Sequence, residues 1–161
     1  MAIKVQDQSS EVQAMAKNWP IVEALLGGTA TMRAAGKSFL PPWPGEDAKS
    51  YDSRLATATL FPAFSRTLGV MSGKPFSKQI VLSDDVPDDI KGWLDDVDLH
   101  GNSLHTFAAS MMDEVLSFGF AGVVVDHPKV EGARTKDEFK SAGARPYMVA
   151  IRHSQLLGWK T

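Results

Sequence analysis

Residues 103–128 constrain the fold more than any other part of this sequence. They run SLHTFAASMMDEVLSFGFAGVVVDHP, in which apolar residues first recur at helical spacing and then follow one another almost without interruption. Asn102 or Ser103 can cap the helix. Its apolar face consists of Leu104, Phe107, Ala108, Met111, Val115 and Phe118. Gly119 is the candidate structural hinge, and we expect it to end the helix with a positive φ.

A strand is predicted directly after that hinge. Val123, Val124 and Val125 are consecutive β-branched residues, which is typical of a strand covered on both faces, here by the helix and by neighbouring elements. A charged interval separates this strand from a second candidate, PYMVAIR, and we expect the two to pair antiparallel across an exposed loop. The sequence thus predicts one α+β domain over residues 1–161, with several helices packed on a small mixed or antiparallel sheet.

The first half of the chain is predicted to be largely helical. Apolar spacing predicts a helix over residues 10–26 that Pro20 either kinks or divides in two and that Gly27 and Gly28 stop. Shorter helical stretches are expected over residues 29–39 and 86–94, and an extended stretch over residues 76–82. One further helix should begin near Ser50 or Asp52, bend at Pro62 and carry Leu55, Ala58, Phe61, Phe64, Leu68 and Met71 along one side.

Composition excludes several classes of function. The sequence has no cysteine, so disulfides, thiolate nucleophiles and thiolate metal sites are absent. No pair of its four histidines has the spacing of a helical metal site, and there is no phosphate-binding loop or nucleophile elbow. A net charge of −2 argues against strong nucleic-acid binding, and no apolar run is long enough to span a membrane. We therefore expect a non-enzymatic protein with no catalytic residues, cofactor or metal.

One segment invites a metal-binding interpretation. In DVDLHGNS, Asp96, Asp98 and Gly101 occupy the first, third and sixth positions of a calcium-binding EF-hand loop. However, His100 stands at the fifth position, and Phe107 stands at the twelfth, where a bidentate glutamate is required. A capped start to the following helix explains the segment better. An acid/base or metal-dependent enzyme would depend on these aspartates and the scattered histidines alone.

Several stretches together resemble the N-terminal part of a family of tailed-phage portal-like structural proteins. They are AAGKSFLP (34–41), RTLGVMSGKP (66–75), DVDLHGNSL (96–104), AGVVVDHP (121–128) and RPYMVAI (145–151), and the resemblance extends from about Trp19 to Trp159. None of them is a catalytic signature. Chains of this family are several times longer, so we expect this one to carry the wing part only.

The resemblance implies a phage structural protein. In portal proteins the wing packs neighbouring subunits around a ring at one capsid vertex, which serves DNA packaging and head–tail connection. The implied partners are other copies of the chain and the capsid, scaffold or terminase proteins, in the host cytoplasm during assembly and later in the virion. On this interpretation Phe61, Phe64 and Met71 are candidate packing or interface residues. An alternative is a small phage or prophage protein that binds a host or phage protein without catalysis.

Overall fold

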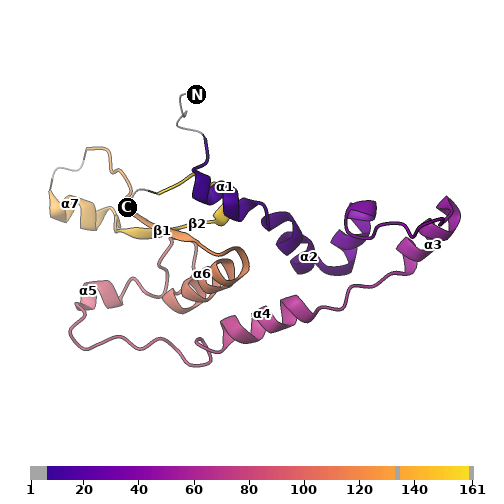
Figure 1. Ribbon diagram of the computed structural model, residues 1–161. Coiled ribbons are helices and arrows are strands. Elements are labelled where there is room, and N and C mark those ends of the chain that lie inside the picture. The colour runs from indigo at the N-terminus through magenta and orange to yellow at the C-terminus, as the bar shows by residue number, and fades with distance from the viewer. Residues whose placement is uncertain (1–6, 133–134, 160–161) are drawn as a thin grey trace.

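The computed structural model describes residues 7–132 and 135–159 and has an α+β fold, as the sequence predicts. About half of the chain is helical, and the sheet has two strands. Figure 1 shows an elongated molecule in which helix α3 (Ala48–Thr57) lies at one end, and helices α5 (Asp88–Lys91) and α7 (Lys136–Ser141) lie toward the other. The body contains helices α1 (Ser10–Ala16) and α6 (Leu104–Phe118) and the sheet. A long projection leaves this body and is formed by the second half of helix α2 (Trp19–Ala35), α3 and the segments that join them.

The helix predicted over residues 10–26 is divided in two. Helix α1 spans Ser10–Ala16 and is capped by the Ser9 side chain, which accepts a hydrogen bond from the backbone N–H of Val12. Helix α2 spans Trp19–Ala35, with Pro20 in its first turn, where a missing N–H costs nothing. Gly28, at φ 67° and ψ −149°, is non-helical and interrupts α2 where the sequence predicts a stop. Helical structure resumes to Ala35 and continues as a 3-10 turn, η1, over Gly36–Ser38, which agrees with the helical stretch expected over residues 29–39.

The single helix predicted from Ser50 to Met71 is wrong. The structure has α3 over Ala48–Thr57, capped by Asp47, and α4 over Ala63–Gly73. The five residues between them are not helical. Pro62 accounts for the non-helical Phe61, because a proline pushes the residue before it out of helical backbone and removes one N–H. Helix α3 has already ended at that point, with Ala58 extended at ψ 138°. Phe61 consequently lies outside the helix that carries Phe64 and Met71.

The predicted joint between helix and strand is confirmed in its backbone geometry. Helix α5 spans Asp88–Lys91, and α6 spans Leu104–Phe118 with Ser103 as its N-cap. Gly119 ends α6 in the left-handed region, at φ 93°. Helix α6 packs mainly against α4, and its Phe107 is buried.

The two strands pair antiparallel, as predicted. Strand β1 spans Gly122–Asp126 and β2 spans Tyr147–Ile151, with Val124 opposite Val149 at the centre of the register. Helix α7, Lys136–Ser141, lies in the loop between the strands, and a 3-10 turn, η2, follows β2 over His153–Gln155. No strand forms over residues 76–82.

The expectation that both faces of β1 are covered is wrong. Val123, Val124 and Val125 are 48%, 50% and 65% exposed. The three valines alternate between the faces of the strand, so neither face is covered within one chain. The run of β-branched residues predicts the strand correctly. However, the described part of this chain provides no helix or strand that covers the faces of β1.

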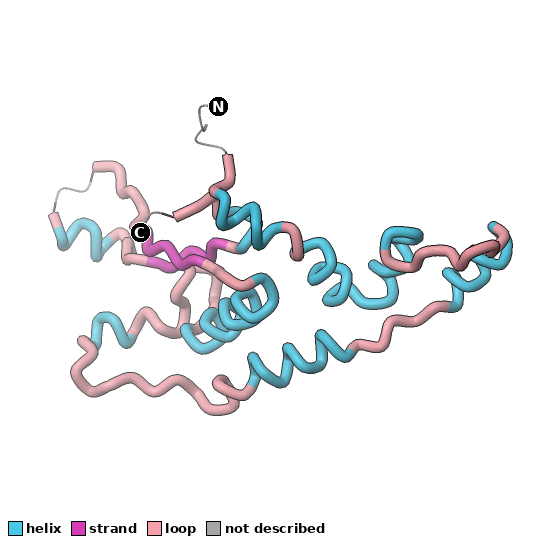
Figure 2. Tube along the Cα trace, in the orientation of Figure 1, coloured by secondary structure: helices cyan, strands magenta, loops and turns pink. Residues whose placement is uncertain are grey.

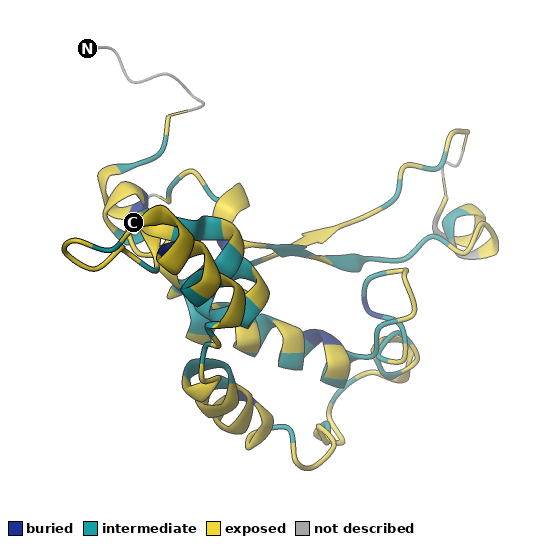
Figure 3. Cartoon of the chain, turned by 90° about the vertical axis from the view of Figure 1, so that its right-hand side faces the viewer, coloured by how far each residue is buried: buried dark blue, intermediate teal, exposed yellow. Residues whose placement is uncertain are grey.

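Few side chains are fully enclosed. Figure 3 shows dark-blue, buried residues only at scattered points along the described chain. The buried apolar residues are Val12, Trp19, Ala24, Met32, Tyr51, Val97 and Phe107. This is a small core for the part of the chain that the structure describes.

Candidate interaction surface

Residues 29–62 form an arm that leaves the body and returns to it. The chain runs outward through the second half of α2, turns through residues 39–47, and comes back through α3 and the segment before α4 (Figure 2). Two hydrogen bonds tie the outward and returning legs together. The Arg33 side chain donates through Nε to the Ala58 carbonyl at 2.9 Å, and the Leu60 N–H donates to Thr29 Oγ1 at 3.0 Å. The arm is therefore braced near its base.

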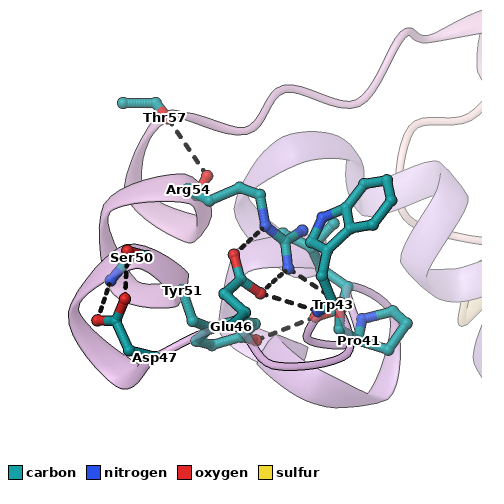
Figure 4. A network of polar contacts seen from close by, with 9 residues as sticks. Pro41, Trp43, Glu46, Asp47, Ser50, Tyr51, Arg54 and Thr57 are labelled. Carbon is teal, nitrogen blue, oxygen red and sulfur yellow. Dashed lines mark hydrogen bonds and ion pairs between the residues drawn. The ribbon is translucent and has the colours of Figure 1, made fainter.

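A second brace holds the tip of the arm (Figure 4). The Arg54 guanidinium donates from Nε to Glu46 Oε1 at 2.8 Å and from Nη2 to Glu46 Oε2 at 2.7 Å, a bidentate pair. Nη2 also donates to the Pro41 carbonyl at 3.0 Å. The same guanidinium lies 5.9 Å from the Trp43 ring centre and 5.4 Å from that of Tyr51. One side chain thus joins α3 to the proline-rich turn.

Two further contacts close the tip. Tyr51, which is buried, donates its hydroxyl hydrogen bond to the Leu40 carbonyl at 3.1 Å. Asp47 accepts hydrogen bonds from the backbone N–H and hydroxyl of Ser50, which lower the pKa of its carboxyl group. The hydrogen bonds from Arg54 likewise lower the pKa of Glu46 and keep it ionised.

The braced arm presents apolar surface to solvent. Trp43 at its tip is 67% exposed and Phe61 on its returning leg is 74% exposed. Met71, two turns along α4 from Phe64, is 55% exposed, whereas Phe64 is half-buried. Two of the three residues predicted from sequence to form an interface, Phe61 and Met71, are therefore accessible to a partner. Trp43 was missed because it stands in a proline-rich connector, and an aromatic residue in such a connector is the signal that could have identified it.

The segment that resembles a calcium loop is a self-contained turn. Asp98 accepts hydrogen bonds from the backbone N–H groups of His100 and Asn102 and from the Asn102 amide. Burial raises the pKa of Asp98, but these hydrogen bonds outweigh it and the net pKa is lowered. Asp96 accepts from the Gly101 N–H at 2.8 Å and pairs with Arg145 at 3.1 Å. Both carboxylates are thus engaged by protein donors, which accounts for their presence without calcium.

A buried histidine that the sequence did not single out joins three elements of the body. His153 is 7% exposed, and its Nδ1 lies 2.5 Å from Glu114 Oε1 on α6. Its ring stacks on Phe118, with centres 3.6 Å apart, and meets Trp19 edge-on. Nε2 lies 3.7 Å from Glu23 Oε1 on α2. This contact fixes the chain after β2 against α2 and α6.

The described residues contain no group of three or more histidine, aspartate or glutamate side chains placed to hold a metal ion. In that same part of the chain, no helix has both the length and the apolar character needed to cross a membrane. The chain matches no protein-family model, and no curated protein resembles it significantly.

Proposed function

We propose that this protein is a non-enzymatic structural subunit that assembles with other copies of itself, and specifically a wing-like module of a tailed-phage portal. In this proposal the subunits form a ring at the capsid vertex, in the host cytoplasm during assembly and then in the virion. The sequence resemblance described above supplies the specific family. The surface of the chain supplies the argument for assembly.

The accessible surface carries the proposal. The chain exposes 11796 Å². A compact monomer of 17.5 kDa is expected to expose about 7,900 Å². The difference, about 3,900 Å², indicates that the chain as a whole is extended rather than compact. A chain with this much unused surface and so small a core gains stability by packing against neighbours.

The arm supports the same proposal. The Arg54–Glu46 pair holds the turn that carries Trp43, and the Trp43 side chain is 67% exposed at the tip of the arm. Holding this turn in advance lowers the entropy that ordering it would cost on association. An arm at one end of an elongated subunit also suits contact with a different surface of the next copy, which is the kind of contact that closes rings.

The test is the oligomeric state of the purified chain. Sedimentation velocity across a range of concentrations should detect assembly, and electron microscopy should show rings with cyclic symmetry. Phe61→Ser and Met71→Ser should each weaken assembly without unfolding the chain, because both side chains are largely exposed. Ala14→Lys, on the exposed side of α1 and outside the arm, is the control.

A chain that stays monomeric at all concentrations would contradict the proposal. It would favour the alternative of a small protein that binds one host or phage partner.

A further inference from the structure

The sheet is incomplete as it stands in one chain. A two-stranded sheet is marginal in water, and three or more strands or a covering layer are normally needed. Here β1 pairs with β2 alone, and Val124 and Val125, which point to opposite faces, are 50% and 65% exposed. Such a strand is unusually apolar for one that remains in contact with solvent.

The outer edge of β1 is the more open of the two edges in the described chain. On the outer edge of β2, the Met148 N–H donates a hydrogen bond at 2.7 Å to the Val97 carbonyl, and no second backbone hydrogen bond forms there among the described residues. The outer side of β1 has no such contact among the described residues. Alternate residues of β1 therefore direct their backbone N–H and C=O groups away from β2, ready to pair with another strand.

The same chain carries a segment suited to that edge. Residues 79–82, Gln-Ile-Val-Leu, lie in the middle of the long connection between α4 and α5 and have neither helical nor strand structure (Figure 2). Val81 is 89% exposed and Ile80 is 40% exposed. Isoleucine and valine strongly favour strands, and the sequence itself predicts an extended stretch here. An exposed, strand-forming segment and an open apolar strand edge thus occur in one chain without meeting each other.

We infer that residues 79–82 of one copy add as a third strand to the outer edge of β1 in a second copy. The inference rests on the proposed self-assembly and names the surfaces that make it. Each copy would contribute residues 79–82 to one neighbour and would bind the same segment of another neighbour at its β1 edge. The contact therefore joins two different surfaces and can repeat from copy to copy. The contact would cover Val81 and one face of β1, where Val124 and Val125 are 50% and 65% exposed, and so would bury apolar surface that one chain leaves in solvent.

Cysteine cross-linking tests the contact directly, because the natural chain has no cysteine. A full-length Val81→Cys chain is mixed in turn with Val123→Cys, Val124→Cys and Val125→Cys chains and treated with diamide. Side chains of a strand alternate between its two faces, so Val81 should lie on the same face either as position 124 or as positions 123 and 125. The yield of linked heterodimers should be at least tenfold higher at the position or positions on that shared face than on the other face. Val81→Cys mixed with Ala14→Cys, at an exposed position of α1, is the control pair. Equal linking at all three positions, or none above the control, would overturn the inference.

Two other results would also overturn it. Preferential linking of Val124→Cys chains to each other would mean that β1 pairs with β1 across a twofold axis. A Val81→Lys chain that assembles as tightly as wild type would mean that the segment takes no part. We expect this variant to fold normally and to lose at least tenfold in association, whereas Ala14→Lys, outside the arm and the sheet, keeps it.

Failure of the inference and of the proposed function can be told apart. If wild type forms rings but Val81→Cys links to no position of β1, the strand addition is wrong and the assembly stands. If wild type remains monomeric by sedimentation, both are wrong.

Discussion

At the scale of single residues, His153 is the polar group on which the body most depends. It is buried beside Glu114, whose side chain is itself only 17% exposed, and between two aromatic rings. Replacing it with leucine removes the ring's contact with that carboxylate and leaves only the hydrogen bond from the backbone N–H of residue 153, so His153→Leu should lower the free energy of unfolding by about 2 kcal/mol. His127→Leu, at an exposed histidine, should change it by no more than about 0.5 kcal/mol. Urea denaturation measures both, and equal effects would contradict the assigned role.

Protonation of Glu46 should weaken the arm at low pH. Its hydrogen bonds from Arg54 hold its pKa below the ordinary 4.5. Because the pKa is lower in the folded chain, the pair stabilises the arm fully above pH 4.5 and loses that contribution as the pH falls through the folded value. Carboxyl ¹³C shifts should therefore place the Glu46 midpoint below 4.5. In Arg54→Gln the midpoint should rise, and a midpoint that does not move would show that Arg54 is not the cause.

At the scale of elements, the joint between α6 and β1 depends on Gly119. Its φ of 93° is costly for any residue with a Cβ atom and most costly for a β-branched one. Gly119→Val should destabilise the chain by about 2 kcal/mol. Ala109→Val, within α6, should cost about 0.5 kcal/mol, and Glu131→Ala, in the exposed turn after β1, no more than that. Thermal denaturation ranks the three, and a Gly119→Val chain as stable as Glu131→Ala would mean that this turn is misassigned.

Local signals made some elements predictable from sequence and left others hidden. Ser103, Gly119 and the valine run act through neighbouring backbone, so α6, its end and β1 could all be placed. Pro62 predicts a bend within one helix, whereas the structure has two separate helices with a non-helical segment before the proline. The arm's braces and the His153–Glu114 contact join residues 8 to 39 positions apart, and no pattern in a single sequence reports such pairs. The exposure of β1 was unpredictable for another reason, because a β-branched run does not say which chain covers it.

At the scale of the whole molecule, stability should depend on protein concentration. Assembly binds only folded chains, so it stabilises them by mass action, by about 2.7 kcal/mol where free partner exceeds its Kd a hundredfold. The urea midpoint of the wild type should therefore rise between low and high micromolar protein. Val81→Lys should show the same midpoint at both concentrations, since it is expected to associate weakly. A wild-type midpoint independent of concentration would contradict assembly.

The braces of the arm also determine the order in which this chain can fold. They close loops of 8, 25 and 31 residues, whereas the hydrogen bond from Trp19 Nε1 to the Phe118 carbonyl closes one of 99. Closing 99 residues rather than 25 costs about 1.2 kcal/mol more in chain entropy. Contacts near in sequence form first when stability is similar. The arm is thus complete while α2 and α6 are still apart, and a nascent chain presents its projecting aromatic surface before it has a body.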